Sequence, residues 1–315
     1  MDKKASVIIP NWNGVAYLPT CLGALQGQRF TDLETIVVDN GSHDGSLELL
    51  AREYPQVKVI ALPKNLGFAG GCNVGLQKAS GQVLCILNND TQVEPDWLAE
   101  LLAALERHPD AGMATSRVRL FDDRSRLHTT GDFVRVNGTF DSRGVWQLDE
   151  GQFDQEEYVF GAAGVAPAFR REMLDDIGLF DADLMSYCED VDLSWRAQLA
   201  GYKCIYAPRA VLYHKVSATG GGPTASFYVA RNTIWVLAKN LPSTLWKKYR
   251  AGIVAAQLTR FMDAARSWRG EAARATMRGQ LAGFVGLLKM LPKRRLIQAH
   301  RRVSDAYIAS LLVAL

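Results

Sequence analysis

Residues 83–90 read Val-Leu-Cys-Ile-Leu-Asn-Asn-Asp, an uninterrupted apolar run followed at once by polar side chains. Five consecutive apolar residues predict a strand that is buried on both faces, as in a parallel sheet. Open parallel sheets bind their ligands at the carboxyl ends of the strands. Asp90 therefore lies where a hard oxygen ligand would hold Mg²⁺ or Mn²⁺ against a diphosphate.

Alternating strand and helix patterns surround this segment and predict repeated β-α units over residues 5–110. Such units form a mostly parallel, Rossmann-like sheet with helices on both faces, which is the α/β class. The strands are expected at 5–10, 35–39, 57–62 and 83–87, and the helices at 15–25, 46–54, 70–79 and 95–108.

The pattern loosens after residue 110. Residues 118–150 are polar and glycine-containing, and we expect short strands and a loop insertion there. Residues 158–169 and 204–207 resemble strands, whereas 171–177 and 191–200 resemble helices. A helical region follows from residue 225, and we expect Pro242 and Pro292 to divide it.

The length of 315 residues and the 48% hydrophobic content predict one large domain, or one domain with an appendage. The five cysteines are scattered, which argues against a disulfide framework or a zinc site and fits a reducing cytosol. We expect no signal peptide, because residues 1–4 lead straight into a strand-like segment. No window reaches the roughly 18 apolar residues of a membrane span.

Charge is distributed unevenly along the chain. Residues 231–315 hold 16 Lys or Arg against 3 Asp or Glu, and the remainder holds 20 against 30. A basic, amphipathic end predicts contact with a membrane surface or an anionic partner. The alternatives are a solvated tail packed on the front domain, or an oligomer contact, which Trp235, Trp246 and Trp268 would also suit.

Polar residues follow the first two predicted strands, so they should meet at one edge of the sheet. Pro10 ends the first strand, Asn11 and Asn13 follow it, and Asp39 ends the second. Asp39 could accept a hydrogen bond from a pyrimidine N–H or a ribose hydroxyl. The alternative is that these Asp and Asn residues only form turns.

A glycine-rich turn over residues 65–73 precedes the third helix and contains Asn65, Gly67 and Asn73. Glycines there let backbone N–H groups approach a phosphate or a sugar. The turn is not a Walker A motif, since no Gly-Lys-Ser/Thr follows. It is also not the first β-α turn, so it does not match a dinucleotide fingerprint.

A second acidic cluster consists of Glu189, Asp190 and Asp192. One of these carboxylates could take the proton from an attacking hydroxyl. Acids at a helix start also favour the helix dipole, and Asp192 could simply pair with Arg196 one turn later. His214 could complete a metal site with Asp90. We expect no such role for the other histidines, which are His43, His108, His128 and His300.

Taken in order, residues 6–14, 38–42, 65–71, 87–91 and 189–196 resemble the motifs of the family 2 inverting glycosyltransferases of the GT-A fold. The resemblance is to the bacterial rhamnosyltransferase-like branch and covers roughly residues 5–240. The set of motifs is specific, although each motif alone is not. The expected domains are a GT-A domain over 1–240 and a basic helical region over 241–315.

The resemblance implies a nucleotide-sugar donor, a divalent metal (Mg²⁺ or Mn²⁺) and displacement with inversion at the anomeric carbon. Asp39 matches the position that reads the base, and Asn89 would lie near the ribose. Asp90 and His214 would bind the metal or the diphosphate. Asp190 matches the catalytic base, with Glu189 beside it, and residues 161–164 would line the acceptor side.

The family's D-x-D motif is Asn88-Asn89-Asp90 in this chain, so only one of its three positions is acidic. The donor diphosphate would then supply much of the metal coordination, and metal binding without donor should be weak. Mg²⁺ commonly takes only one or two carboxylates and completes its shell with waters and phosphates.

We therefore expect an inverting transferase that moves L-rhamnose from dTDP-L-rhamnose to a hydroxyl of a lipid-linked or cell-surface glycan, as in polysaccharide or lipopolysaccharide synthesis. The alternatives are a UDP-sugar donor or an inactive nucleotide-sugar-binding scaffold. A sugar nucleotidyltransferase is disfavoured, because residues 10–20 lack the Lys or Arg that a triphosphate loop needs. We expect a cytoplasmic, peripheral location at the inner membrane face and no nucleic-acid partner. A homo-oligomer is the alternative to a monomer as the assembled state.

Overall fold

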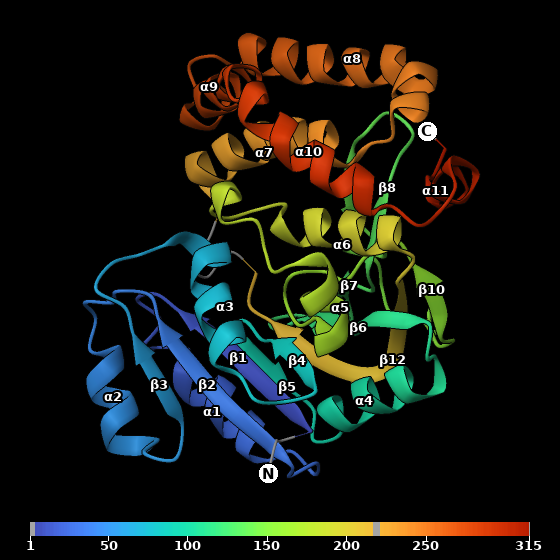
Figure 1. The fold of residues 1–315 in the computed structure, drawn as a ribbon. Helices are drawn as coiled ribbons and strands as arrows, with labels where there is room; N and C mark the ends of the chain where they lie inside the picture. Colours follow the sequence, from blue (N-terminus) through green and yellow to red (C-terminus); the bar gives the residue numbers. More distant parts are fainter. Residues whose placement is uncertain (1–3, 217–220, 315) are drawn as a thin grey trace.

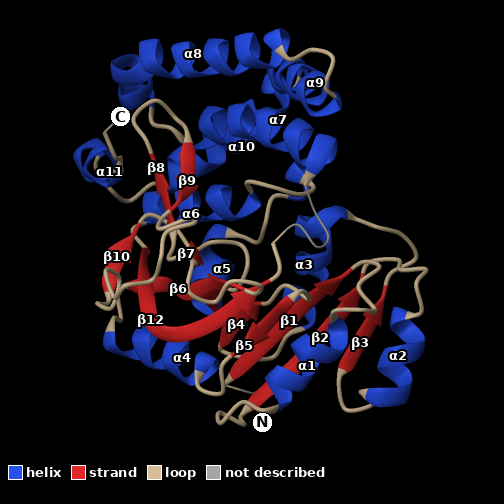
Figure 2. Cartoon of the chain, turned by 180° about the vertical axis from the view of Figure 1, so that it is seen from behind, coloured by secondary structure: helices blue, strands red, loops and turns tan. Residues whose placement is uncertain are grey.

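The computed structural model describes residues 4–216 and 221–314. Its main feature is a ten-stranded mixed sheet in which eight strands follow the order β10-β12-β6-β11-β4-β1-β2-β3 (Figures 1 and 2). β5 pairs with β12, and β7 pairs with β6. β8 and β9 form a separate two-stranded sheet.

The parallel part of the sheet confirms the prediction from the apolar runs. It consists of β4 (Val83–Ile86), β1 (Ala5–Asn11), β2 (Leu33–Asp39) and β3 (Lys58–Ala61). The register sets Asn11 opposite Asp39, so the ends of β1 and β2 coincide. The predicted edge of polar residues therefore exists.

Helices cover both faces of this sheet, as expected. One face packs against α1 (Leu18–Gln26), α2 (Ser46–Glu53) and α4 (Trp97–Arg107), and the other against α3 (Gly67–Lys78), α5 (Arg171–Ile177) and α6 (Glu189–Ala200). A Cβ on Gly75 would lie 2.4 Å from the Ile8 side chain, so only glycine allows α3 to pack this close to the sheet.

The part of the sheet beyond β4 differs from the prediction. β6 (Ala111–Leu120) and β12 (Lys203–His214) are long strands, whereas we expected no strand at the former and only residues 204–207 at the latter. Arg117 and Arg119 make β6 read as polar, but the Asp149 carboxylate binds both guanidinium groups. Pro208 interrupts the pattern of β12 where the register shifts between Ala207 and Val211.

The strand expected over residues 158–169 is in fact two strands with a loop between them. β10 (Glu157–Val159) pairs with β12, and β11 (Ala168–Arg170) pairs with β4 and β6. The remaining short strands are β5 (Thr91–Val93), β7 (Leu127–Thr129), β8 (Asp132–Val134) and β9 (Phe140–Ser142). The expectation of short strands and loops after residue 118 is confirmed from Leu127 onward.

A helical layer stacks on the sheet domain beyond α6 (Figure 1). Its elements are α7 (Gly222–Asn240), α8 (Ser243–Arg266), α9 (Glu271–Val285), α10 (Leu287–His300) and α11 (Asp305–Leu311), and the short η1 (Ala182–Leu184) precedes α6. Pro242 immediately precedes α8, as predicted. Pro292 lies inside α10, so the prediction of a break there is wrong, and the chain turns at Gly286 instead.

The helical layer shares a hydrophobic core with the sheet domain. Trp195 of α6, Trp235 of α7 and Met290 of α10 belong to one buried cluster. The Lys239 ammonium is 1% exposed and forms ion pairs with Asp181 and, at 2.8 Å, with Asp192. This core crosses residue 240, and the domain boundary placed there stays a prediction.

All five cysteines are free and buried. Within residues 4–216 and 221–314, the helices are too short or too polar for any of them to cross a membrane.

Candidate active site at the carboxyl edge of the parallel strands

Hydrogen bonds join three predicted binding residues at the ends of β1, β2 and β4. The Asn11 amide donates to Asp39 Oδ1 at 3.0 Å, and the Asn89 amide donates to Asn11 Oδ1 at 2.7 Å. Asp39 Oδ2 accepts from the Ser42 backbone N–H. A Cβ on Gly14 would lie 2.1 Å from the Asn89 amide nitrogen, so the loop after β1 packs directly on this chain of side chains.

Asn13 fixes the same loop to its neighbour. It has a positive φ of 50°, and its side-chain oxygen accepts from the His43 backbone N–H at 2.9 Å. Asp39 is fully buried with both oxygens engaged. In this structure Asp39 and Asn13 shape the loops, as the turn alternative proposed, and their contact with a nucleotide stays a prediction, as does that of Pro10.

Polar groups of the glycine-rich turn form hydrogen bonds with other parts of the protein. Asn65 Oδ1 accepts from the Gly67 N–H at 2.7 Å, and the Ala69 N–H donates to the Met185 carbonyl at 2.9 Å. Gly67 has φ 76°, and a Cβ there would lie 2.6 Å from that carbonyl. The first turn of α3 therefore holds the segment that precedes the acidic cluster, and phosphate binding at this turn stays a prediction.

Asn73 has a similar structural position on α3. Its amide donates to the Phe180 carbonyl at 2.8 Å and its oxygen accepts from the Phe180 N–H at 3.1 Å. Both polar groups of Asn73 are thus used to hold the loop before η1. Its contact with a sugar nucleotide stays a prediction.

Asp90 and His214 come together through the pairing of β5 with β12, which sets Thr91 opposite His214. His214 Nε2 lies 3.2 Å from Asp90 Oδ1, and both residues are buried. Asp90 Oδ1 nevertheless lacks a well-directed hydrogen bond. A buried oxygen without a donor, facing an imidazole nitrogen, fits a bound cation.

His128 lies against His214 and was not expected to have a role. Their Nδ1 atoms are 3.1 Å apart. Burial, with a smaller contribution from His214, lowers the pKa of His128 to about 3, so its ring is neutral at pH 7. A neutral His128 can accept from His214 Nδ1–H, which leaves the His214 Nε2 lone pair directed towards Asp90.

Asp90 and His214 could supply two protein ligands to a cation. Among the described residues, no group of three His, Cys, Asp or Glu side chains could enclose a metal. Completion of the coordination by the donor, which the reduced D-x-D motif led us to expect, stays a prediction. Lys215, which sequence reasoning missed, follows His214, is exposed, and has its ammonium 5.8 Å from the Tyr17 ring.

The acidic cluster lies at the start of α6. Asp190 Oδ2 accepts from the Gly164 N–H and Oδ1 from the Val191 N–H, both at 2.8 Å. Burial raises the pKa of Asp190, although these hydrogen bonds oppose the shift. The Asp190 residue as a whole is partly exposed. A raised pKa brings a carboxylate closer to the strength that a general base needs.

Glu189 and Asp132 are buried beside Asp190. Burial and the Asp190 charge raise the pKa of both groups well above their ordinary values. Glu189 Oε2 has no hydrogen-bond partner, whereas Asp132 accepts from the Ser142 hydroxyl at 2.8 Å. The Asp190 charge therefore opposes ionisation of both neighbouring carboxyl groups. Asp132 was not predicted, because nothing in its local sequence distinguishes it.

Asp192 has a different role from Asp190. It is fully buried and pairs with Arg196 at 3.0 Å, which confirms the alternative of an ion pair one helical turn apart. With Lys239 on its other oxygen, Asp192 is a structural residue.

Residues 164–165 connect the end of β4 to Asp190 on α6. The Asn88 N–H donates to the Val165 carbonyl at 3.0 Å, and the neighbouring Gly164 N–H donates to Asp190. A Cβ on Gly164 would lie 2.8 Å from Asp190 Oδ2. The loop expected to line the acceptor side thus bridges the strand that carries Asp90 and the acid on α6.

A family model described as Glycosyl transferase family 2 matches residues 6–178, more than half of the chain. The chain belongs to glycosyltransferase family 2. A curated relative is the N-acetylglucosaminyl-diphospho-decaprenol L-rhamnosyltransferase of Mycobacterium tuberculosis, which is 26% identical over 263 residues, 76% of this chain and 86% of the relative. The family predicted from the ordered motifs is confirmed.

Solved structures confirm the GT-A fold. GalNAc-T7 with UDP, GalNAc and Mn²⁺ aligns with a TM-score of 0.62 at 18% identity, over 95% of this chain and 58% of that one. The mannosyltransferase PcManGT of Pyrobaculum calidifontis, in complex with GDP-Man and Mn²⁺, aligns at 0.56 and 18% identity, over 99% and 84%.

Proposed function

We propose that this glycosyltransferase inverts the anomeric centre while moving one sugar from a nucleoside diphosphate donor to a saccharide hydroxyl. The observation that carries the proposal is the bridge through residues 164–165, which connects the Asp90 strand end to the Asp190 carboxylate. One backbone segment thus connects the proposed cation-binding edge to a carboxylate that has no cationic partner within residues 4–216 and 221–314.

In this proposal Asp190 accepts the proton of the acceptor hydroxyl while that oxygen attacks the anomeric carbon and the diphosphate leaves. Burial, which raises the pKa of Asp190, supports this role. Asp90 and His214 would hold Mg²⁺ or Mn²⁺, which when bound neutralises charge on the departing diphosphate. Lys215 is placed to add a positive charge on the same side.

We propose dTDP-L-rhamnose as the donor and a lipid-linked or cell-surface saccharide as the acceptor. The name of the Mycobacterium tuberculosis relative, a rhamnosyltransferase acting on a diphospho-decaprenol acceptor, supports both choices. A UDP-sugar donor is the alternative, supported by the UDP bound to GalNAc-T7. The basic C-terminal helices support a peripheral location at the cytoplasmic face of the inner membrane.

The donor half of the proposal is tested by thermal shift with dTDP, UDP, GDP and CMP, each with and without Mn²⁺. A ligand at about a hundred times its Kd adds roughly 2.7 kcal/mol of stability. We expect a metal-dependent shift with one of these nucleotides that disappears in Asp90→Ala. A shift that survives this substitution unchanged would remove Asp90 from the metal site.

The chemical half is tested by Asp190→Asn. Loss of a general base lowers kcat by about 10²- to 10⁴-fold, and the nucleotide-induced shift should persist. Asp122→Asn, an exposed carboxylate of the loop after β6, is the matched control. Turnover of Asp190→Asn at the wild-type rate would refute the base assignment. Donor binding by the wild type without transfer to any acceptor would favour the inactive scaffold.

A further inference from the structure

An apolar groove runs between α7, α8, α9 and α10, with a volume of about 690 Å³. Its walls include Trp246, Leu258, Phe261, Leu281 and Phe284. Each of these five side chains is at least 43% exposed, although all are large and apolar. A groove this large and apolar on a helical surface marks a binding site for an apolar group.

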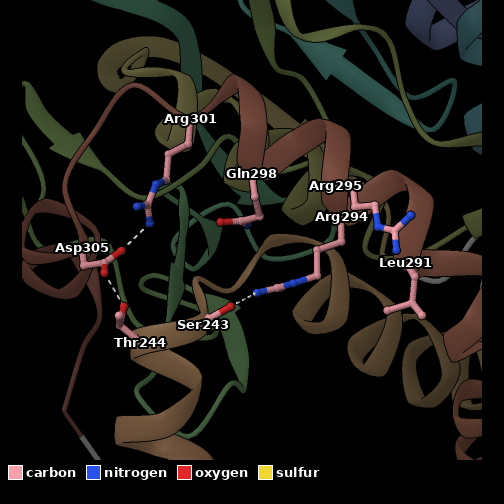
Figure 3. A pocket seen from close by; sticks show the side chains of 8 residues that line it. All are labelled: Ser243, Thr244, Leu291, Arg294, Arg295, Gln298, Arg301 and Asp305. Atoms are coloured by element: carbon pink, nitrogen blue, oxygen red, sulfur yellow. Dashed lines mark hydrogen bonds and ion pairs between the residues drawn. The ribbon is translucent and has the colours of Figure 1, made fainter.

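A polar hollow of about 480 Å³ adjoins the groove, and the two share Ser243, Leu291 and Arg294 as lining residues. Figure 3 shows this hollow, with Arg294 directed to the Ser243 hydroxyl and Arg301 to Asp305. Arg295 also lines the hollow. Within the described part of the chain it has no ion-pair partner, so its charge is available to an anion.

Further apolar side chains project outside the groove on the same helices. Val285, Leu288 and Leu296 are 73%, 77% and 74% exposed and do not line the groove. They belong to the segment of 16 basic and 3 acidic residues. Apolar residues on a strongly basic surface match the chemistry of an anionic bilayer, in which both kinds of side chain find partners.

We propose that the groove binds one acyl chain of an anionic membrane phospholipid and that Arg295 binds its phosphate. The continuity of groove and hollow places an apolar wall and a free cation side by side, as a lipid with a charged head requires. The proposal extends the membrane location given under the proposed function and does not depend on sugar transfer.

Two other occupants fit the same features less well. A second copy of this chain would bring two strongly basic surfaces together, and like charges repel. A single lipid-linked acceptor would fill the groove but leave Val285, Leu288 and Leu296 in water. A bilayer buries these three side chains as well as supplying the lipid.

The test measures binding of the full chain to vesicles of phosphatidylcholine, alone or mixed with phosphatidylglycerol, without donor or acceptor. We expect binding only to the anionic vesicles. Arg295→Glu should weaken it about thirtyfold, because it removes one positive charge and adds a negative one near the surface. Arg52→Glu, on exposed α2, makes the same charge change and should bind like the wild type.

A separate fluorescence experiment measures whether an acyl chain enters the groove. It uses phospholipids that are brominated on the acyl chain, because bromine quenches the fluorescence of nearby indole rings. Trp246 lines the groove, so Trp246→Phe should remove most of the quenching while vesicle binding persists. Leu258→Glu and Leu281→Glu should abolish quenching, with folding checked by circular dichroism. Transfer to a water-soluble acceptor should keep its kcat in all of these variants.

Three outcomes would overturn the proposal. Binding to anionic vesicles with unchanged quenching in both groove variants would reduce the interaction to surface charge. Binding only after a polyprenyl phosphate is added would assign the groove to the acceptor. A dimer seen by light scattering and lost in Leu281→Glu would assign it to a second copy. A failure of transfer with vesicle binding intact would contradict the proposed function alone.

Discussion

Replacing Lys239 by methionine should destabilise the protein far more than replacing any exposed lysine of the helical layer. The Lys239 ammonium is 1% exposed and forms ion pairs with Asp181 and Asp192, whose side chains are 10% and 0% exposed. Methionine keeps most of the side-chain volume. The substitution therefore removes the charge and leaves the two carboxylates without this cation.

The expected cost is about 3–5 kcal/mol, the usual effect of removing one partner from a buried ion pair. Asp181 keeps Lys293 and Asp192 keeps Arg196, which favours the lower end of the range. Lys289→Met is the matched control, because Lys289 pairs with Asp183 at 2.6 Å but is 58% exposed. Such an exposed pair contributes about 0–1 kcal/mol.

Equilibrium urea unfolding of the wild type and of both variants measures this difference. If Lys239→Met and Lys289→Met lower the unfolding free energy by amounts within about 1 kcal/mol of each other, the reasoning is refuted. Burial would then not determine how much each ion pair stabilises the protein. The double variant with Asp192→Asn should cost less than the sum of the two single changes. Neutralising that carboxylate removes part of the charge that Lys239→Met leaves unpaired.

The difference in unfolding free energy between the wild type and Lys239→Met should also depend on pH. Burial alone would raise the pKa of Asp181 and Asp192, but Lys239 lowers both below their ordinary values. A lowered carboxyl pKa stabilises the fold above the unfolded pKa of about 4, and this stability is lost as pH falls through the folded value. The difference in unfolding free energy between the wild type and Lys239→Met should therefore be largest at neutral pH and should decrease below about pH 4.

Three further predictions concern the candidate site. Glu189→Gln should raise the melting temperature at neutral and alkaline pH. The pKa of Glu189 is raised, so the wild type loses stability as pH rises through that pKa, whereas the glutamine variant does not; in acid the two proteins should melt alike. Gly164→Ala should lower kcat with an unchanged nucleotide shift, since its Cβ would displace the Asp190 carboxylate, whereas Gly23→Ala, in open space on α1, should leave kcat unchanged. His214→Ala should weaken the Mn²⁺-dependent nucleotide shift without affecting any metal-free shift, and an equal loss of both would contradict a ligand role.

The sequence predicted the parallel half of the sheet because its strands are buried on both faces and therefore carry unbroken apolar runs. β6 escaped prediction for the opposite reason. Arg117 and Arg119 give it a polar pattern, and both guanidinium groups pair with Asp149 of the distant insertion. A partner 30 residues away leaves no periodic signal in the strand itself.

The candidate site divides in the same way. Asp90, Asp190 and their neighbours follow apolar strands or begin helices, so position along the chain identified them. Asp132 and His128 come from short strands of the polar region, and only tertiary pairing brings them to the Asp190 and His214 side chains. Residues recruited by tertiary contact alone have no local signature.

Asp190 and Asp192 illustrate how surroundings assign different roles to like groups. Both are aspartates in the first turn of α6, two residues apart, and burial acts on both. Lys239 and Arg196 pair with Asp192 and lower its pKa, so Asp192 stays ionised where the helical layer packs on the sheet domain. Asp190 has only backbone N–H donors, and its pKa is raised. An uncompensated carboxylate can gain by accepting a proton, which is why we propose as the base Asp190, the acid that has no cationic partner among the described residues.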